Sequence, residues 1–430
     1  MSSRDAPLSL RLYTAATAMV EPLAPALLRA RVRRGKEEAA RLGERLGQAT
    51  LPRPQGVLVW LHGASVGESL SLLPLIEALD KSRPDLALLV TTGTRTSAEL
   101  MAQRLPIAAL HQYVPVDGPR AVEAFLNHWR PDLAVFVESE LWPNLLTAAK
   151  ARGVRLALLS AKLSNASFRG WSRLRGAAGR LWGGFDLVLA QDERSFERLT
   201  ALGVRPAGLA DLKFGAKPLP VNLGKLNALR TRIGERPVIL AASTHPREEE
   251  IVLQRFAAAA DTAGRAERRP LLVIAPRHPE RGAAITEAGE TQGFRVTRQG
   301  VGESIDDDAP VHVADALGEL GLWYRLAELS VIGGSLVAGV GGHNPLEPAR
   351  LGRPFIAGAH VENWRTAYQG LAEAGGVGLA ATPETLDRYL AQAIDRNDAL
   401  AGMARRAQAY VAEHDDAVRA VPARVLALLR

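Results

Sequence analysis

The sequence predicts an α/β protein with two doubly wound domains, each a parallel sheet covered by helices on both faces. Its 430 residues exceed the usual size of one domain, and 47% hydrophobic with 23% charged residues is typical of a soluble globular chain. From Gly56 onward, short Leu- and Val-rich runs alternate with helical patterns. The alternation lapses around residues 213–226, where Pro218, Pro220 and Gly224 indicate a domain linker.

The expected strands form one set before this linker and one after it. The first set comprises residues 57–61, 86–91, 133–137, 155–159 and 187–190. The second comprises residues 238–241, 271–275, 311–313, 330–332 and 354–357. Helical segments separate the runs, so consecutive strands should be parallel. We expect a Rossmann-like domain over residues 51–217, a second over 218–430 whose last helix could pack back on the first, and a ligand-binding cleft between them.

Residues 1–50 form an N-terminal segment with an apolar and then a basic stretch. The apolar stretch, residues 8–28, is interrupted by four residues: Arg11, Glu21, Pro22 and Pro25. A spanning helix needs about 20 clean apolar residues, and a signal peptide carries its basic residues before the apolar stretch, so neither fits. Residues 29–53 hold three glutamates against eight basic residues: Arg29, Arg31, Arg33, Arg34, Lys36, Arg41, Arg45 and Arg53.

Two interpretations of this segment stay open. An interfacial helix followed by a polybasic stretch would hold the protein at the anionic cytoplasmic face of a membrane. Alternatively, the helix is an ordinary amphipathic one that packs on the first domain. The basic stretch carries a net +5 of the chain's formal +7, so the remainder is nearly balanced and no broad nucleic-acid-binding face is expected.

Residue types and motifs that the sequence lacks exclude or disfavour several classes of protein. The chain has no cysteine, which excludes disulfides, zinc–thiolate sites, iron–sulfur clusters and a cysteine nucleophile. Neither G-x-G-x-x-G nor G-x-x-x-x-G-K-[ST] occurs, which disfavours NAD enzymes and P-loop ATPases. The pair Asp306 and Asp308 matches a divalent-metal pattern of some sugar transferases, but three consecutive acids are also typical of a solvated turn.

The first candidate site is the segment HGASVGE, residues 62–68, where the first expected strand runs into a helix. As a structural feature, Ser65 and Glu68 form a capping box, in which Glu68 reaches back to the Ser65 amide. As a functional feature, Glu68 is a general base at a strand end. The helix N-terminus would weaken this base and desolvation would strengthen it, so spacing alone does not decide.

The second candidate is VFVESELWPN, residues 135–144, again a strand that runs into a helix. If the backbone is still extended there, Glu138 and Glu140 point to opposite sides and one of them faces the cleft. The alternative is an exposed Glu140 and a Glu138 that caps a neighbouring element. Lys162 and the segment 211–214, which contains Lys213, could bring cations to the rim.

The third candidate lies in the second half of the chain, where polar groups follow successive strands. These groups are Ser243-Thr244-His245, Pro276-Arg277-His278, Gly318-Glu319, and the segment GGHNPLEP at residues 341–348. Asn344 suits an N-cap, Pro345 the first helical position and Glu347 the first turn, with glycines that allow close approach of an anion. Glu347 could accept hydrogen bonds from ribose, and Arg277 offers a bidentate fork to a phosphate or carboxylate. A well-capped structural helix beside a salt-bridged arginine is the alternative, and the histidines lack metal-ligand spacing.

Six blocks, HGASVGE, ESELWPN, AASTHPREEE, PRHPER, ALGELG and GGSLVAGVGGHNPLEPA, resemble in order and spacing the 3-deoxy-D-manno-octulosonic acid (Kdo) transferases of lipopolysaccharide biosynthesis. The resemblance covers essentially the whole chain. It implies a GT-B glycosyltransferase with the acceptor on the first Rossmann-like domain and the donor on the second, facing each other across the cleft. It further implies inverting transfer of Kdo from CMP-Kdo to the 6′-hydroxyl of the lipid A precursor at the inner membrane, with no cofactor and no bound metal.

The resemblance also implies roles for individual residues. Glu68 would be the general base, and Glu138 and Lys213 would stabilise the transition state. CMP-Kdo would be bound by these residues: Ser243, Thr244, Pro276, Arg277, Leu317, Gly318, Glu319, Asn344, Pro345, Leu346 and Glu347. The family pattern has Asn where this chain has Asp211, a carboxylate that could pair with Lys213. Another GT-B nucleotide-sugar transferase, a sugar-nucleotide epimerase, or a non-catalytic sugar-binding protein are the rival interpretations.

Overall fold

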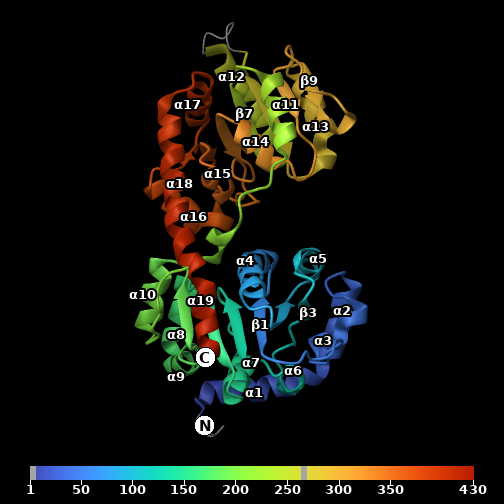
Figure 1. Cartoon of the computed structure of the whole chain (residues 1–430), viewed down its shortest axis with the longest axis vertical. Helices are drawn as coiled ribbons and strands as arrows, with labels where there is room; N and C mark the ends of the chain where they lie inside the picture. The colour runs from blue at the N-terminus through green and yellow to red at the C-terminus, as the bar shows by residue number, and fades with distance from the viewer. Residues whose placement is uncertain (1–5, 263–268) are drawn as a thin grey trace. The chain divides into compact units, whose positions relative to one another are not determined.

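The computed structural model describes residues 6–262 and 269–430, which divide into two compact units (Figure 1). The first unit is Met1–Ala216 with His414–Arg430, and the second is Lys217–Glu413. The boundary at Ala216 falls inside the segment expected to be a linker. Residues 6–50, expected as a separate segment, belong to the first unit, and so does the end of the chain.

The first unit contains a six-stranded, all-parallel sheet in the order β3-β2-β1-β4-β5-β6. Its strands are β1 Leu58–Gly63, β2 Ala87–Thr92, β3 Ala109–Tyr113, β4 Leu133–Val137, β5 Arg155–Ala161 and β6 Leu187–Ala190. Strand β3 was not predicted, because its residues ALHQY lack the β-branched pattern. As the edge strand, β3 is only partly buried, so it does not need that pattern.

Helices surround this sheet. They are α1 Leu8–Val20, α2 Ala24–Arg33, α3 Leu42–Arg45, α4 Val66–Ser82, α5 Arg95–Arg104, α6 Pro119–Trp129, α7 Pro143–Ala151, α8 Asn165–Arg173, α9 Arg175–Trp182, α10 Glu193–Ala201 and α19 Val421–Leu426. A 3₁₀ turn, η4, spans Leu212–Gly215. Near the C-terminus, α19 packs against α4, the helix that begins beside Glu68.

The second unit contains a seven-stranded, all-parallel sheet in the order β13-β12-β11-β7-β8-β10-β9. Its strands are β7 Val238–Thr244, β8 Leu271–Pro276, β9 Val296–Arg298, β10 Val311–Val313, β11 Leu329–Ile332, β12 Phe355–Ala357 and β13 Gly378–Leu379. The sequence analysis missed β9 and β13, which are edge strands too short to show a period.

The helices of the second unit are α11 Leu223–Ile233, α12 Glu248–Thr262, α13 Gly282–Thr291, α14 Leu320–Leu326, α15 Leu346–Arg350, α16 Arg365–Glu373 and α17 Pro383–Ile394. The long helix α18, Asp398–Arg419, begins in the second unit and ends in the first. The predicted fold class, α/β with two parallel doubly wound sheets, is confirmed.

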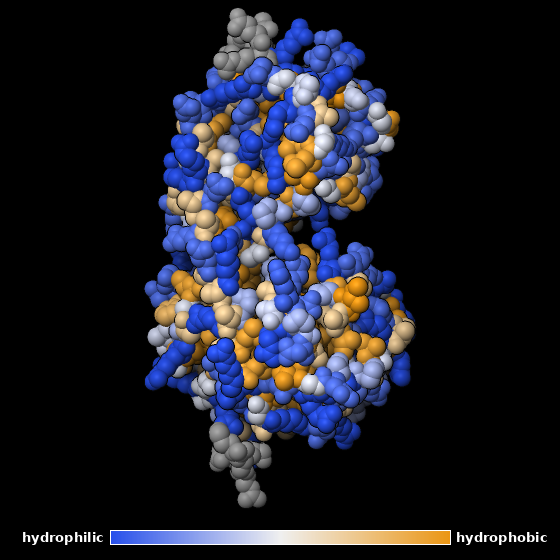
Figure 2. Space-filling model, in the orientation of Figure 1, coloured by the Kyte–Doolittle hydropathy of each residue, from blue (hydrophilic) through white to orange (hydrophobic). Residues whose placement is uncertain are grey.

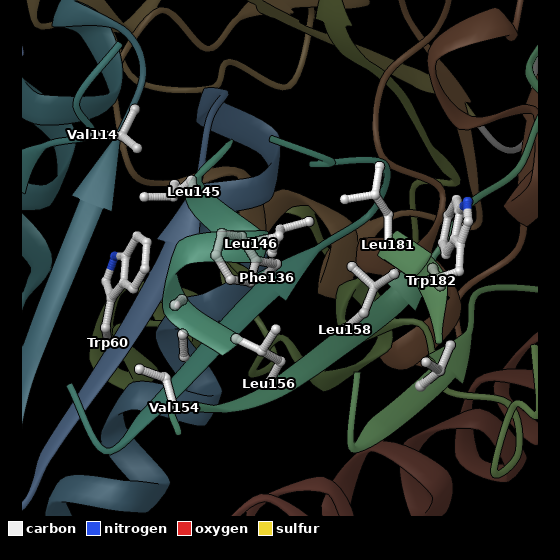
Figure 3. Close-up of a cluster of buried hydrophobic side chains, with 14 of the residues drawn as sticks. Trp60, Val114, Phe136, Leu145, Leu146, Val154, Leu156, Leu158, Leu181 and Trp182 are labelled. Carbon is white, nitrogen blue, oxygen red and sulfur yellow. The ribbon is translucent and has the colours of Figure 1, made fainter. Parts of the chain in front are cut away.

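Each sheet is held by a core of side chains from strands and covering helices. In the first unit, Trp60 and Phe136 from adjacent strands contact each other, with ring centroids 5.1 Å apart, and Leu145 belongs to the same core (Figure 3). The central strands are buried on both faces, as all-parallel sheets require. This burial fixes the strand ends, and therefore the loops that carry the candidate residues.

Helix α1 packs against α6 and α7 through polar contacts. Tyr13 donates to Asp117, Thr14 donates to the side-chain oxygen of Asn144 at 2.7 Å, and the Asn144 Nδ2 group donates to Thr17 at 2.9 Å. Most of its apolar side chains are not used in this packing. Leu8, Leu12, Met19, Val20, Leu23 and Leu27, on α1 and the residues after it, are exposed. The helix therefore packs on the first unit, as the second interpretation predicts, and it also presents an apolar surface. The membrane-binding interpretation stays a prediction.

Half of the basic stretch is used internally. Arg41 bonds Glu44 and the His111 carbonyl, Arg45 lies buried against Glu37, Arg53 donates to the Trp129 carbonyl, and Arg31 pairs with Glu37. The exposed residues that form no ion pair with a described residue are Arg29, Arg33, Arg34 and Lys36. The net +5 counted from the sequence thus overstates the charge available to a partner. Hydrophilic residues predominate on the face shown in Figure 2.

Among the described residues, no helix is both long enough and apolar enough to span a membrane.

Candidate active site

The strand order places a topological switch point in each unit. In the first, β1 lies between β2 and β4, and in the second, β7 lies between β8 and β11. Consecutive strands lead away from these points in opposite directions, which opens a crevice at their carboxyl ends where α/β proteins bind ligands. Glu68 and Glu138 follow β1 and β4. Ser243 lies near the carboxyl end of β7, and the glycine-containing segment 333–342 follows β11. The two candidate half-sites therefore occupy the position expected of a ligand site in each sheet.

Glu68 is tied into the start of α4. Ser65 caps the helix by accepting from the Glu68 amide at 3.3 Å. The Glu68 carboxylate accepts from the Ala64 amide at 2.8 Å and from the Ser65 hydroxyl at 2.9 Å. The Glu68 carboxylate was expected to accept from the Ser65 amide. It accepts instead from the amide of the preceding residue, Ala64. These bonds hold the carboxylate in one orientation at the end of β1.

Burial and the nearby charges of Glu140 and Glu138 raise the pKa of Glu68. The hydrogen bonds from Ser65 and Ala64 oppose this effect but do not cancel it. A carboxylate with a raised pKa is a stronger base than an ordinary one, as a general base for a sugar hydroxyl requires.

Glu138 does not lie on extended backbone. Its φ is +56°, in the left-handed region, so the chain turns directly after β4. The expectation that Glu138 and Glu140 point to opposite sides was conditional on an extended chain, and this condition is not met at Glu138. Their charges both act on Glu68, and the side chains of Glu138 and Glu140 are only about one-fifth exposed. A left-handed non-glycine residue is strained, and such strain concentrates at functional sites.

Lys213 compensates this group of acids. Its Nζ lies 2.8 Å from a carboxylate oxygen of Glu138. Burial lowers the pKa of Lys213, but the charges of Glu138, Asp211 and Glu68 outweigh burial and raise it. Lys213 is therefore protonated at neutral pH; it contacts Glu138 directly and interacts electrostatically with Glu68.

Asp211 has a role that the sequence did not show. One of its oxygens accepts from the Lys213 main-chain amide at 3.0 Å, and the other accepts from Gln191 at 2.9 Å. Burial raises the pKa of Asp211. The residue caps η4 and positions the Lys213 backbone, and the Lys213 ammonium forms its ion pair with Glu138.

The third acid, Glu140, is held by His62 and Trp142. His62 Nε2 lies 3.5 Å from Glu140, and the indole N–H of Trp142 donates to it at 2.6 Å. Burial raises the pKa of Glu140, but these contacts outweigh burial and lower it. Glu140 therefore keeps its negative charge, which repels the charge of Glu68. The interpretation of Glu140 as a solvent-exposed residue is therefore wrong. Lys162, which was expected to bring a cation to the rim, donates its main-chain amide to the Glu138 carbonyl.

In the second unit, the predicted donor residues gather at the ends of β7, β8 and β11. Ser243 lies on left-handed backbone, φ +56°, and its carbonyl oxygen would lie 2.3 Å from a Cβ at Gly333, so only glycine fits there. The Arg277 amide donates to the Thr244 carbonyl at 3.0 Å, which joins the ends of β7 and β8. Pro276 ends β8 and the Arg277 side chain is exposed without an ion pair to any described residue, so the salt-bridged alternative is not observed.

The segment Asn344–Glu347 begins α15, one residue later than expected. Asn344 accepts from the Leu346 amide at 3.0 Å, Pro345 precedes the helix, and Asn344 also contacts Glu347 at 3.4 Å. Burial raises the pKa of Glu347 to about 7, against the lowering effects of Asn344 and Arg277. The partly protonated carboxyl can both donate and accept, which suits vicinal hydroxyl groups.

Leu317, Gly318 and Glu319 lie between β10 and α14. Leu317 is largely exposed and Gly318 has φ +83°. Glu319 is held by Lys225 at 2.5 Å and by Gln299 at 2.8 Å, and these contacts lower its pKa although burial acts in the opposite direction. The Glu319 side chain is thus fixed by residues of its own unit. A ligand could therefore be contacted by the main chain on either side of Glu319.

The sequence analysis did not single out Glu248, the first residue of α12. Its side chain is fully buried, and its carboxylate accepts three main-chain N–H groups, from His245 at 3.0 Å, Gly334 at 2.7 Å and Leu336 at 2.8 Å. One carboxylate therefore joins the loop after β7 to the loop after β11. The available signal was a run of three glutamates at the start of a helix. The same run is also typical of a solvent-exposed helix face, so it did not indicate Glu248.

If these loops bind the CMP-Kdo donor that the family resemblance implies, Glu248→Gln should weaken CMP binding by roughly tenfold, about 1.4 kcal/mol. A glutamine offers one acceptor oxygen, and its NH₂ group would oppose at least one of the three N–H donors, so the glycine loop has to shift. Calorimetric titration with CMP measures the effect. Glu250→Gln, on the exposed face of the same helix, is the matched control. Equal affinity of the two variants would exclude this positioning role.

The acidic segment 306–308 is a salt-bridged turn. Asp306 pairs with Arg295 at 2.5 Å, and Asp308 pairs with Arg269 at 3.3 Å. The metal-site interpretation of this pair is therefore not favoured. In the part of the chain that the structure describes, no group of three or more histidine or acidic side chains is arranged to hold a metal ion.

This chain is similar to known proteins over most of its length. A family model described as 3-deoxy-D-manno-octulosonic-acid transferase (kdotransferase) matches residues 40–216. The 3-deoxy-D-manno-octulosonic acid transferase of Rickettsia bellii is 32% identical over 395 residues, which cover 90% of this chain and 92% of that protein.

Solved structures share the architecture at low identity. A glycosyltransferase of Rickettsia africae has a TM-score of 0.56 at 10% identity and covers 88% of this chain and 100% of that one. The UDP-GlcNAc 2-epimerase of Neisseria meningitidis, bound to UDP-GlcNAc, has a TM-score of 0.56 at 14% identity and covers 86% of this chain and 99% of that one. With two parallel doubly wound sheets and polar groups at both switch points, this chain has the GT-B fold. Within that class it belongs to the Kdo transferase family, whose members are glycosyltransferases.

Proposed function

We propose that this enzyme transfers Kdo from CMP-Kdo to the 6′-hydroxyl of the acylated, phosphorylated glucosamine disaccharide that is the lipid A precursor. The observation that carries the proposal is the cluster of Glu68, Glu138 and Lys213 at the switch point of the first sheet, in a chain of this family. The reaction inverts the anomeric centre and needs no bound metal.

Glu68 would remove the proton from the acceptor hydroxyl as the new bond forms. Its raised pKa suits that role, and its bonds to Ala64 and Ser65 fix the carboxylate without a further cation. Lys213, held by Glu138, would stabilise negative charge that develops as the donor bond breaks. The Glu68 carboxylate can act as a base without uncapping α4, because the side chain that caps this helix is the Ser65 hydroxyl.

The second unit would bind the donor. Arg277 offers a fork for the phosphate or the Kdo carboxylate, and the left-handed glycines after β11 let main-chain N–H groups approach an anion. Asn344 and Glu347 would bind the ribose, with Pro345 and Leu346 between them, and the backbone of Leu317–Glu319 would hold the base. The predicted contacts of Ser243, Thr244 and Pro276 complete this half-site.

The test is incubation of purified protein with CMP-Kdo and the acylated, phosphorylated disaccharide in the presence of EDTA, followed by mass spectrometry of the lipid. We expect a mass gain of one or more Kdo units. Absence of product from a folded protein that still binds CMP would contradict this acceptor. An epimerised sugar nucleotide in place of a lipid product would support the epimerase alternative, with which this chain shares a fold at 14% identity.

We further propose that the protein lies peripherally on the cytoplasmic face of the inner membrane. The exposed apolar side chains of residues 8–27 and the four exposed basic residues at 29–36 that form no ion pair with a described residue make a surface of the kind that binds anionic lipid. Its helix α1 is bonded to Asn144, six residues after Glu138. An acceptor embedded in a bilayer would thus meet the proposed active site beside the membrane-binding surface.

We expect Leu12→Glu combined with Met19→Glu to reduce binding to vesicles containing anionic lipid by roughly tenfold or more, since each apolar side chain contributes about 1.5–3 kcal/mol when buried. Vesicle co-sedimentation measures the loss. Leu223→Glu, an equally exposed leucine of the second unit, should bind vesicles normally. If all three proteins sediment equally, the N-terminal segment is not the membrane-binding surface.

A further inference from the structure

Two histidines of the second unit share a hydrogen bond. The Nε2 atoms of His245 and His343 are 2.8 Å apart, and their rings are stacked with centroids 5.1 Å apart and planes 13° apart. At this distance one nitrogen has to carry a proton and the other a lone pair, because two N–H groups or two lone pairs would repel. His278 contacts the pair through the His245 ring, at 5.8 Å and nearly perpendicular. The residues come from three separate loops, so their spacing in the sequence did not reveal the pair.

The acids near the pair are already compensated. Glu248 accepts three main-chain N–H groups, and Glu249 pairs with Arg281 at 3.2 Å. The remaining charged or titratable groups that act on the pair, Arg277 and His278, both disfavour a positive charge on it.

The pair is therefore uncharged at neutral pH in the absence of a ligand. Burial, followed by His245, Arg277 and His278, lowers the pKa of His343 to about 4. Burial also lowers the pKa of His245, and it outweighs the opposing effect of Glu248. A negative charge placed beside the pair would reverse this balance, because an anion favours the imidazolium form.

The pair lies within the proposed donor half-site. His245 directly follows Ser243 and Thr244, and His343 directly precedes Asn344. A CMP-Kdo donor brings a phosphodiester and a carboxylate to these loops. We propose that the His245–His343 pair takes up one proton when the nucleotide donor binds, and that the resulting imidazolium supplies positive charge to the leaving phosphate. This inference rests on the proposed function for the identity of the donor.

The acceptor oxygen forms its bond to the anomeric carbon while the bond from that carbon to the phosphate oxygen breaks. The electron pair of the broken bond stays on the phosphate, and the hydroxyl proton passes to Glu68. The imidazolium keeps its proton and donates a hydrogen bond to the phosphate dianion, and the proton returns to solvent when CMP leaves. One ring can gain this proton while the other still accepts across the Nε2–Nε2 bond.

The experiment is calorimetric titration of the full-length protein with CMP at pH 7.0 in two buffers of different ionisation enthalpy. The second phosphate pKa is about 6, so CMP is mainly a dianion and proton uptake reports on the protein. We expect an uptake of roughly half to one proton by the wild type and nearly none by His343→Gln or His245→Gln. A glutamine retains a hydrogen-bonding group but cannot become a cation, so a purely structural role would leave the uptake unchanged.

His278→Gln is the matched control, because it removes a neighbouring histidine and leaves the shared bond in place. We expect it to retain the uptake. The proposal is overturned if the wild type binds CMP without proton uptake, or if the His343→Gln variant takes up as much as the wild type. It is also overturned if EDTA abolishes the uptake, which would indicate a metal between the rings. In these cases the proposed function stands, whereas a folded wild type that binds no CMP would contradict both proposals.

Discussion

Glu68→Gln should reduce kcat for Kdo transfer by roughly 10²–10⁴-fold, the range of general acid–base catalysis, and should leave the affinity for CMP nearly unchanged. The glutamine oxygen can still accept from the Ala64 amide, and the side chain keeps its length, so α4 should begin in the same way. What is lost is the ability to take the proton of the acceptor hydroxyl. Single-turnover kinetics with the disaccharide acceptor, together with CMP titration, separate the two effects.

Ser65→Ala is the matched control for the capping function. It removes the hydroxyl that caps α4 and one of the two donors to the Glu68 carboxylate, at a cost of about 1 kcal/mol in the free energy of unfolding. If capping were the only function of this segment, Ser65→Ala would impair transfer more than Glu68→Gln. Substantial turnover by the glutamine variant would rule out Glu68 as the base.

If Glu68 is the base, the transfer activity should depend on pH. A base has to be deprotonated, so activity falls as pH drops through its pKa, and the raised pKa of Glu68 places this acid limb above that of an ordinary carboxyl group. Glu140→Gln removes one of the charges that raise the pKa of Glu68. We expect its acid limb in kcat/KM to move to lower pH, and an unmoved limb would show that another group titrates.

The elements that the sequence predicted are those with strong patterns. The buried central strands β1, β4 and β7 are continuous apolar runs, and a parallel sheet covered on both faces needs such runs. The edge strands β3, β9 and β13 were missed because partial burial and short length remove the pattern. Their existence depends on pairing with neighbours that are distant in sequence.

The residues of the candidate site could be proposed from the sequence, but the contacts between them could not. Position after a strand indicated Glu68, Glu138 and Arg277, because strand ends meet at one edge of a sheet. The left-handed turn at Glu138 and the His245–His343 bond depend on packing between loops, which no local pattern encodes. Charge counting failed for a similar reason at Arg41 and Arg45, which pair inside the first unit.

Lys213→Met should reduce kcat by roughly 10²–10³-fold, the range for loss of one preorganised electrostatic group, with little effect on CMP affinity. The methionine keeps the apolar stem and removes the charge that lies 2.8 Å from Glu138. Glu138 then remains largely buried without its ion-pair partner, so the variant should also be less stable. Asp211→Asn, which restores the residue of the family pattern, is the matched control and should retain most activity.

The double variant Lys213→Met with Glu138→Gln distinguishes two roles for the lysine. If Lys213 serves only to neutralise Glu138, removal of both charges should restore stability and much of the activity, because no uncompensated carboxylate remains beside Glu68. If Lys213 itself stabilises the transition state, the double variant should recover stability, measured by urea unfolding, while its kcat stays as low as that of Lys213→Met. We expect the second result, because the charges of Glu138, Asp211 and Glu68 keep Lys213 protonated beside the proposed base. Recovery of activity together with stability would show that Lys213 serves only to neutralise Glu138.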